Sequence, residues 1–386
     1  MKILIPGMDG YIGWALTLHQ LSLGNEVCGL DNFSRRKNVD EMNSHSALPI
    51  LSIEKRIDYL EKKFPGKFSF YEGDLLDSHF IDDVVKRFSP DAVVHLAEQP
   101  SAPFSMIDQE HNIYTQQNNV IGTLNLLHSI QRHVPNTHLV KLGTMGEYGY
   151  DPGLEIAEGF FEIEFRGKKA TIPYPKLAGS WYHWSKVHDS NNIMFACKLW
   201  GLRCTDIMQG IVYGTRTHEI TNENEFTRYD FDEAFGTVIN RFCAQAVTGY
   251  PLTVYGLGGQ TRGFLALVDS IQCISILLEN PPHDGEYRVV NQFDQQYGVR
   301  DLAEKVQKVG KTLGLDVTIQ TKENPRKEME KHFYQADHEK LKKLGFENTR
   351  SVEEEIKLIL EDLLEHKERI ESKKDIMFKG IKWNKK

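Results

Sequence analysis

Three glycines at a fixed spacing follow the first apolar run of the chain. Gly7, Gly10 and Gly13 come directly after Lys2–Pro6, which has the composition of a buried strand. Glycines at this spacing allow a tight turn, close approach of the backbone to a pyrophosphate and close packing of the following helix. The N-terminus of that helix, expected over Tyr11–Leu23, then directs its partial positive charge at the phosphates. The motif alone is equally typical of an ordinary tight turn, so its context decides between the two interpretations.

Apolar runs of strand type alternate with segments of helical length through the first half of the chain. This alternation predicts an α/β fold of Rossmann type, a doubly wound parallel sheet with helices on both faces. After about residue 210 the pattern becomes mixed. We expect a dinucleotide-binding domain over 1–210 and a smaller mixed lobe over 211–386 that mainly binds substrate, with some segments returning to the first domain. The strand candidates of the first half are Lys2–Pro6, Glu26–Leu30, Phe68–Tyr71, Ala92–Leu96, His138–Leu142 and Arg203–Met208.

A carboxylate at the end of the second predicted strand indicates which dinucleotide binds. Asp31 comes about 18 residues after the last glycine, where it can accept hydrogen bonds from the adenosine ribose and repel a 2′-phosphate. Arg35 and Arg36 follow closely and fit either the phosphate of NADP or a solvated loop, but the acid at the strand end favours NAD. Asp74 is a candidate for the adenine, although Asp after Gly73 is also typical of a turn.

A tyrosine and a lysine four residues apart form the candidate catalytic pair. Tyr182 and Lys186 share one face of a predicted helix. Free tyrosine is a poor base at neutral pH, but a nearby ammonium favours the phenolate, which can take a hydroxyl proton while NAD takes the hydride. The spacing is common by chance. Its position supports it, because the helix follows a strand ending at Gly143–Gly149, at the edge where open sheets bind ligands. Thr144 can donate to the same substrate oxygen.

The overall composition argues against several functional classes. A formal net charge of −8 disfavours nucleic acid and anionic membranes as partners. No run of about 18 apolar residues occurs, so we expect no membrane span. The five cysteines are scattered without a CxxC pair, which predicts no metal site and a reducing compartment. A strand pattern that starts at the first residues leaves no room for a targeting peptide, so we expect a cytoplasmic protein.

Together these residues resemble the extended short-chain dehydrogenase/reductases that act on nucleotide sugars. Shorter segments that fit this family are Asn118–Thr123, Val212–Gly214 and Gly259–Gly263, and one branch of the family matches more closely in the runs Gly143–Gly149, Tyr182–Ser190, Gln209–Gly214, Asn240–Cys243, Pro251–Gly263, Asn291–Phe293 and Asn324–Arg326. The resemblance implies NAD contacts from Gly7, Gly10, Tyr11, Ile12, Gly13, Asp31, Asn32, Arg35, Arg36, Asp74, Leu75, Leu96, Ala97, Asn119, Tyr182, Lys186 and Gln209. It implies UDP-sugar contacts from Thr144, Gln209, Arg241, Val254, Tyr255, Gln260, Arg262 and Arg326, with Arg262 at the diphosphate. The resemblance also implies a homodimer.

For that branch the resemblance implies UDP-glucose and sulfite as substrates, and an enzyme formally grouped with hydrolases of carbon–sulfur bonds. C4 of the sugar is oxidised, the C6 hydroxyl is eliminated, sulfite adds at C6 and C4 is reduced again, so NAD is restored. Two alternatives stay open. One is a nucleotide-sugar epimerase or dehydratase, and the other is a non-catalytic NAD-binding protein.

One departure from related enzymes bears on the elimination step. Nucleotide-sugar 4,6-dehydratases carry Thr-Asp-Glu where this chain has Thr144–Gly146, so their acid and base are missing here. Glu147 and His183 are the remaining catalytic candidates. Glu147 also fits a residue that caps a turn or binds an arginine, and His183 also fits a packing residue. The insertion Asp151–Lys176 fits either a lid over the sugar or a surface loop.

Overall fold

Seven parallel strands form the central sheet of the computed structural model, which describes residues 1–149, 154–323, 335–378 and 381. The strand order is β12-β8-β5-β4-β1-β2-β3, and the predicted Rossmann-type fold is confirmed. The strands are β1 (Lys2–Pro6), β2 (Glu26–Asp31), β3 (Phe68–Glu72), β4 (Ala92–His95), β5 (His138–Leu142), β8 (Arg203–Gln209) and β12 (Tyr287–Gln292). The last of these returns from the second half of the chain to pair with β8.

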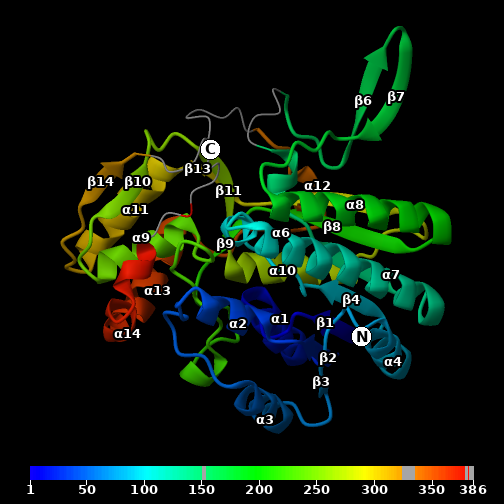
Figure 1. Cartoon of the computed structure of the whole chain (residues 1–386), viewed down its shortest axis with the longest axis horizontal. Helices are drawn as coiled ribbons and strands as arrows, with labels where there is room; N and C mark the ends of the chain where they lie inside the picture. The colour runs from blue at the N-terminus through cyan, green and yellow to red at the C-terminus, as the bar shows by residue number, and fades with distance from the viewer. Residues whose placement is uncertain (150–153, 324–334, 379–380, 382–386) are drawn as a thin grey trace.

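Helices cover both faces of this sheet (Figure 1). Alternate side chains of β1 show why: Ile3 and Ile5 belong to one hydrophobic cluster and Leu4 to the other. The first cluster includes apolar side chains of α1 and α10, and the second those of α4, α7 and α8. The helices of this lobe are α1 (Tyr11–Ser22), α2 (Ser34–Glu41), α3 (Ile53–Lys63), α4 (Ser78–Phe88), α5 (Ala102–Ser105), α6 (Gln109–Gln116), α7 (Gly122–His133), α8 (Trp181–Trp200) and α10 (Leu267–Glu279).

A smaller mixed lobe packs beside the carboxyl edge of the sheet. Its strands form a parallel pair, β10 (Leu252–Tyr255) with β14 (Ile319–Lys322), and a three-stranded sheet of β13 (Gln295–Gly298), β11 (Thr261–Ala266) and β9 (Ile211–Tyr213). Its helices are α9 (Val238–Val247), α11 (Val299–Thr312), α12 (Glu339–Lys343), α13 (Val352–Glu365) and α14 (Lys367–Glu371). Short turns of helix occur at η1 (Gln117–Ile121), η2 (Met145–Tyr148), η3 (Glu223–Glu225) and η4 (Lys374–Met377). Within the described ranges no helix has both the length and the apolar composition to cross a membrane.

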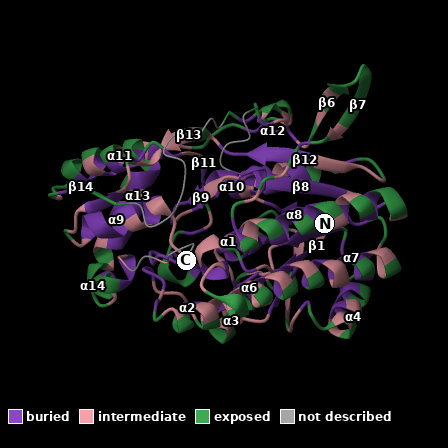
Figure 2. Cartoon of the chain, turned by 45° about the horizontal axis from the view of Figure 1, so that its top comes forward, coloured by how far each residue is buried: buried purple, intermediate pink, exposed green. Residues whose placement is uncertain are grey.

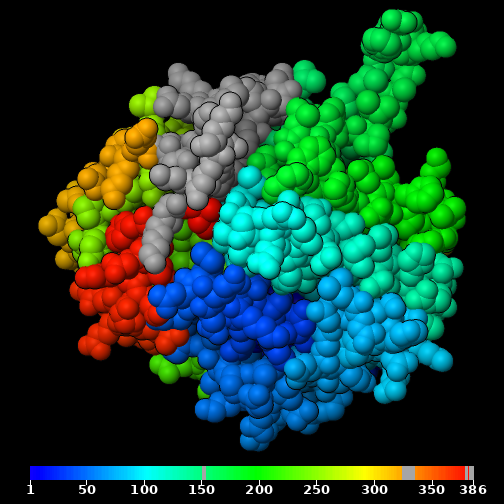
Figure 3. Space-filling model, viewed as in Figure 1, coloured from blue at the N-terminus to red at the C-terminus, as the bar shows by residue number. Residues whose placement is uncertain are grey.

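The insertion before α8 forms an antiparallel hairpin. Its strands β6 (Phe160–Phe165) and β7 (Lys168–Pro173) are joined by a turn at Arg166 and Gly167. The hairpin stands out from the body of the protein and is largely exposed (Figures 2 and 3). Of the two interpretations of Asp151–Lys176, the described part therefore fits a surface element, and residues 151–153 lie outside the described part.

Candidate active site

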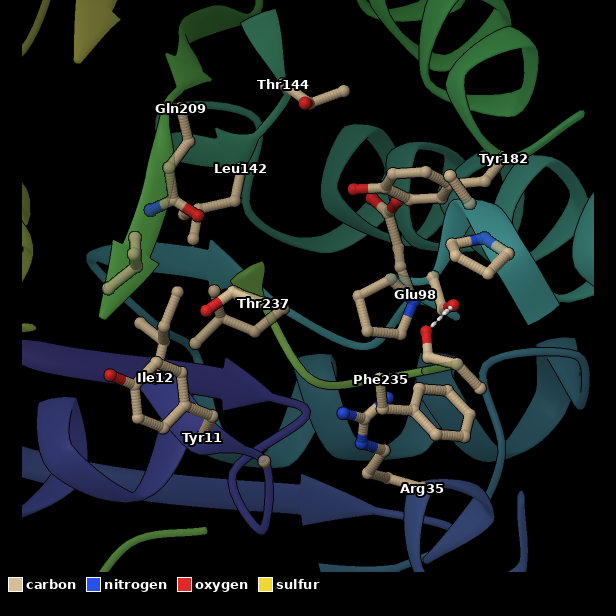
Figure 4. Close-up of a pocket in the computed structure, with 18 of the residues that line it drawn as sticks. Tyr11, Ile12, Arg35, Glu98, Leu142, Thr144, Tyr182, Gln209, Phe235 and Thr237 are labelled. Carbon is tan, nitrogen blue, oxygen red and sulfur yellow. Dashed lines mark hydrogen bonds between the residues drawn. The ribbon is translucent and has the colours of Figure 1, made fainter. Parts of the chain in front are cut away.

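A cleft of about 540 Å³ lies between the carboxyl edge of the central sheet and the second lobe (Figure 4). Most residues that the sequence singles out line this one cleft. From the cofactor set these are Gly7, Gly10, Tyr11, Ile12, Gly13, Asp31, Asn32, Arg35, Asp74, Leu75, Leu96, Ala97, Tyr182, Lys186 and Gln209. From the catalytic and substrate sets they are Thr144, His183, Arg241, Tyr255, Gln260 and Arg262. Sequence positions more than 200 residues apart thus meet at one site.

The glycine turn leaves room for a phosphate group against bare backbone. Gly7 has a φ of +88°, and a Cβ there would lie 2.5 Å from the backbone carbon of Leu96. A Cβ on Gly13 would lie 2.1 Å from the oxygen of Gly7, so the start of α1 packs directly on the turn. Gly10, the N-cap of α1, offers no side chain to the first N–H groups of the helix. Unsatisfied N–H groups at a helix N-terminus are the usual ligands of a dinucleotide pyrophosphate, so these residues fit one.

The carboxylate at the end of β2 lies where a ribose would be recognised. Asp31 lines the cleft and accepts hydrogen bonds from the backbone N–H groups of Asp9 (2.9 Å) and Phe33 (2.8 Å). Burial, reinforced by the neighbouring Asp9 carboxylate, raises the pKa of Asp31 to about 6. Asp31 therefore carries a negative charge at neutral pH, which disfavours a 2′-phosphate beside it.

Both arginines that could have indicated NADP are held by other carboxylates. Arg36 donates two hydrogen bonds to Asp9, at 2.5 and 2.8 Å, and does not line the cleft. Arg35 donates to Asp230 at 2.5 Å and lies over the ring of Phe235, 3.8 Å from its centroid. Contrary to the prediction, Arg36 is therefore not among the residues that line the cleft, because its guanidinium is hydrogen-bonded to Asp9.

The candidate catalytic pair, Tyr182 and Lys186, lies in the first turns of α8 at the middle of the cleft. Ser180 caps the helix by accepting the backbone N–H of His183 at 3.2 Å. The Lys186 ammonium donates to the carbonyl of Leu142 at 2.5 Å and forms an ion pair with Glu98. Its Nζ lies 5.9 Å from the centroid of the Tyr182 ring. Burial and the Glu98 carboxylate raise the pKa of Tyr182 well above its usual range, so the side chain is a neutral phenol in this arrangement.

The turn after β5 directs Thr144 into the cleft and Glu147 away from it. Thr144 accepts the N–H of Gly146 at 3.1 Å, while Glu147 accepts the N–H of Thr144 at 3.4 Å, which together make a capping box. Glu147 is fully buried and pairs with Lys141 at 3.3 Å and with Lys176. Burial opposes ionisation, yet these two lysines hold the pKa of Glu147 below its usual range. Glu147 does not line the cleft, so its placement matches the turn-capping interpretation and not that of a base beside the sugar.

His183 fills the space beside the turn. A Cβ on Gly146 would lie 2.3 Å from Nε2 of His183, so a larger residue at this position would require the ring to move. Nδ1 of His183 lies 3.0 Å from Oγ of Ser180, which orients the ring. His183 lines the cleft next to Tyr182, with ring centroids 5.0 Å apart. Of the two candidates for the elimination step, His183 is therefore the one that the structure places at the cleft.

Two further predicted residues among those that the structure describes do not line the cleft. Asn119 lies behind it on η1, where it donates to the carbonyl of Gln99 at 3.1 Å and to Ser185 at 2.8 Å. Val254 points into the core because it alternates with Thr253 and Tyr255, which do line the cleft. Arg326 lies outside the described residues.

Residues that sequence reasoning missed include Glu98, Phe235 and Thr237, all of which line the cleft. Glu98 had a recognisable signal, because it is a charged residue just after the buried strand β4, at the same edge as Asp31. Phe235 and Thr237 come from an irregular segment of the second lobe, whose position only the folded chain reveals.

Comparison with known proteins identifies the relatives of this chain. The NAD dependent epimerase/dehydratase family matches residues 3–291. The UDP-sulfoquinovose synthase of Sulfolobus acidocaldarius is 48% identical over 386 residues, covering 100% of this chain and 98% of that protein. The chain belongs to the UDP-sulfoquinovose synthases of this family. A chloroplastic UDP-sulfoquinovose synthase of Spinacia oleracea is 46% identical over 385 residues, covering 100% of this chain and 79% of that protein. The resemblance drawn from the motifs is confirmed.

Solved structures agree on the fold. The UDP-glucose 4-epimerase of Thermotoga maritima, solved with UDP-glucose, superposes with a TM-score of 0.72 at 21% identity, covering 95% of this chain and 99% of that one. The UDP-glucose 4-epimerase of Thermus thermophilus, solved with NAD, gives a TM-score of 0.67 at 21% identity, covering 94% and 99%. This chain is an enzyme of an NAD dependent family, so the predictions of an enzyme and of NAD as its cofactor are confirmed.

Proposed function

We propose that this enzyme makes UDP-6-sulfoquinovose from UDP-glucose and sulfite. The observation that carries the proposal is the 48% identity to a UDP-sulfoquinovose synthase over the whole chain. The cleft supports it, because Thr144, Tyr182 and Lys186 lie together beside a cofactor end that fits NAD. The alternatives named from the sequence are weaker. The candidate catalytic pair argues against a non-catalytic NAD-binding protein, and Met145 and Gly146 stand where a 4,6-dehydratase carries its Asp and Glu.

Each side chain at the cleft then has a role in the cycle. Bound NAD supplies an acceptor for the C4 hydride and returns it at the end. Tyr182 takes the proton of the C4 hydroxyl, Lys186 favours its phenolate, and Thr144 donates a hydrogen bond to the same oxygen. The 4-ketone acidifies the proton at C5. His183 removes that proton and water leaves from C6, which opens C6 to sulfite.

The test of this function is the dependence of turnover on sulfite. With UDP-glucose and NAD alone we expect no UDP-sugar product, because the enone must wait for an anion at C6. Added sulfite should give a product whose mass in the UDP-sugar pool fits replacement of the C6 hydroxyl by a sulfonate. Rapid conversion of UDP-glucose to UDP-galactose or to a 4-keto-6-deoxy sugar without sulfite would establish the epimerase or dehydratase alternative.

Arg262 should bind the diphosphate of the UDP-sugar. It lies on β11 and lines the substrate end of the cleft together with Arg241. The protein is acidic overall, so two phosphates need a local guanidinium, whose fork matches phosphate oxygens. Replacing Arg262 with alanine should raise KM for UDP-glucose by about tenfold or more while changing kcat less. Initial rates over a range of UDP-glucose concentrations measure both, and an unchanged KM would place the phosphate site elsewhere.

A homodimer and a cytoplasmic location belong to the same proposal. Apolar side chains of α6 and α8 gather on one exposed surface, where Ile113, Trp181 and Trp184 line a shallow groove. Large exposed apolar patches mark protein interfaces, so a second copy is the proposed occupant and sedimentation should give a dimeric mass.

All five cysteines are unpaired and buried, which fits a reducing compartment.

A further inference from the structure

One stretch of the second lobe, residues 230–237, connects the two lobes across the cleft and is called the bridging segment below. The ring of Phe235 lies against the guanidinium of Arg35, which is 3.8 Å from the ring centroid (Figure 4). Asp230 accepts a hydrogen bond from the same guanidinium at 2.5 Å, and its side chain is only 4% exposed. Two contacts of different kinds thus join the bridging segment to α2 of the first lobe.

Two other parts of the first lobe also hold the bridging segment. The hydroxyl of Ser101, in the loop after β4, donates to the carbonyl of Ala234. Ser44, in the loop after α2, donates to the carboxylate of Asp232 at 2.9 Å. Asp232 in turn accepts the backbone N–H groups of Ala234 and Phe235, both at 2.8 Å. The turn that carries the aromatic ring is therefore fixed from three places in the first lobe.

These attachments lie at the cofactor end of the cleft. Arg35, Ser101 and Phe235 line the cleft together with Asp31 and Asp74. Nη1 of Arg35 is buried and has no hydrogen-bond partner in the part of the chain that the structure describes. Because a buried donor without a partner is costly, this nitrogen fits an oxygen atom of a bound cofactor. The contact between Phe235 and Arg35 therefore belongs to the wall of the cofactor site.

The bridging segment also contacts two residues that are predicted to bind the UDP-sugar. Nη1 of Arg241 donates to the carbonyl of Gly236 at 2.7 Å. The hydroxyl of Tyr255 donates to the carboxylate of Glu233 at 3.2 Å. Both Arg241 and Tyr255 line the cleft. One short segment thus contacts the residues of the substrate end and, within two residues of those contacts, carries the ring that packs on α2.

We propose that binding of the UDP-sugar tightens the hold of the bridging segment on NAD. A diphosphate that engages Arg241 also fixes Gly236, so the neighbouring ring of Phe235 is held on Arg35. A ligand that orders a shared segment lowers the cost of ordering it for the second ligand. By linkage, bound NAD favours the UDP-sugar by the same factor. The proposal rests on the UDP-sugar site of the proposed function.

This coupling suits a cycle that stores a hydride on its cofactor between two steps at C4. If NADH left after the oxidation, a 4-keto sugar would remain bound without the hydride that completes turnover. The coupling retains NADH while the sugar occupies the cleft, and it allows the cofactor to exchange when the cleft holds no sugar.

The rate at which NADH leaves the enzyme tests the proposal. The enzyme is loaded with NADH and mixed with excess NAD, and the fluorescence of NADH is followed with and without saturating UDP. UDP carries the diphosphate but no sugar to oxidise. In the parent we expect UDP to slow release by about tenfold or more, since coupled sites typically differ by about 5- to 150-fold. In Phe235→Ala release should be faster, and UDP should change it by less than about twofold.

Other results would overturn the proposal. Equal release with and without UDP in the parent, while calorimetry shows that UDP binds, would mean that the two sites are not coupled. An undiminished effect of UDP in Phe235→Ala would place the coupling outside the bridging segment. If the alanine variant does not fold, Phe235→Leu decides the matter, because leucine is apolar but has no ring to lie on Arg35. The effect of UDP should shrink in this variant too, and a full effect would contradict the proposal.

A matched control and a binding measurement separate this proposal from the proposed function. Phe165→Ala makes the same chemical change on the exposed hairpin, so it should keep the release rate and the UDP effect of the parent. If calorimetry shows that UDP does not bind the parent, the UDP-sugar site of the proposed function fails and the coupling fails with it. If UDP binds without slowing the release of NADH, only the coupling is rejected.

Discussion

Replacing Tyr182 with phenylalanine should reduce turnover by about 100-fold or more and leave folding and NAD affinity intact. The substitution removes only the hydroxyl that, in the proposed cycle, exchanges a proton with the oxygen on C4, and acid–base groups of this kind contribute about 10²- to 10⁴-fold. The ring itself stays, so its packing on His183 at 5.0 Å between centroids is kept. Activity of the parent and the variant with UDP-glucose, sulfite and NAD measures the effect.

A matched change elsewhere shows that the loss is specific. Tyr71 lies on β3 at the far side of the central sheet, and Tyr71→Phe deletes the same atom away from the catalytic pair. This control should retain activity within a factor of about two, because Tyr71 does not line the cleft and its ring stays in place. Near-normal turnover by Tyr182→Phe, with correct folding, would remove Tyr182 from the mechanism.

Replacing Glu147 with glutamine should lower the free energy of unfolding by about 3–5 kcal/mol. Glu147 and Lys141 are both fully buried, and the Glu147 carboxylate is shared by Lys141 and Lys176, so its loss leaves two positive charges opposite the single carboxylate of Asp206. Ser190 also donates to the Glu147 carboxylate at 2.9 Å, and Lys176 pairs with it. Chemical denaturation of both proteins at pH 7 gives the difference directly. Glu61→Gln, on the exposed face of α3, is the matched control and should change little.

The same pair of proteins should respond differently to acid. The lysines hold the pKa of Glu147 below the range of an unfolded glutamate, so its contribution to stability is present above about pH 4 and is lost as the pH falls below it. The stabilities of parent and variant should therefore converge in acid. Unchanged stability at pH 7 with a block after C4 oxidation would instead restore Glu147 as the C5 base.

The fold was predictable because its strands are buried on both faces. In β1, Ile3, Leu4 and Ile5 are all fully buried, so the strand appears in the sequence as a continuous apolar run. The cleft was predictable at the points where such runs end, since Asp31 and Thr144 both follow a strand at the carboxyl edge. The same rule would have found Glu98, which follows β4.

Other features follow from packing that a linear sequence does not display. Lys141 in the middle of β5 is typical of a solvent-facing position, yet it is fully buried because Glu147 and Asp206 reach it from neighbouring elements. The direction of Glu147 did have a local signal, as Thr144 and a glutamate three residues later make a capping box. The hairpin also had one, in Arg166-Gly167 between two runs of strand type.

The contact between Gly146 and His183 constrains how this enzyme could diverge. An acidic side chain at position 146 would require the imidazole to move, and a smaller residue at position 183 alone would leave an open space and remove the proposed proton carrier. Each single substitution toward a dehydratase, at position 146 or at position 183, should therefore impair the enzyme. Only the double substitution would fill the space between the two residues. The effect of a substitution at one of these positions would thus depend strongly on the residue at the other. This dependence would hinder the evolution of a dehydratase from a sulfosugar synthase, or the reverse.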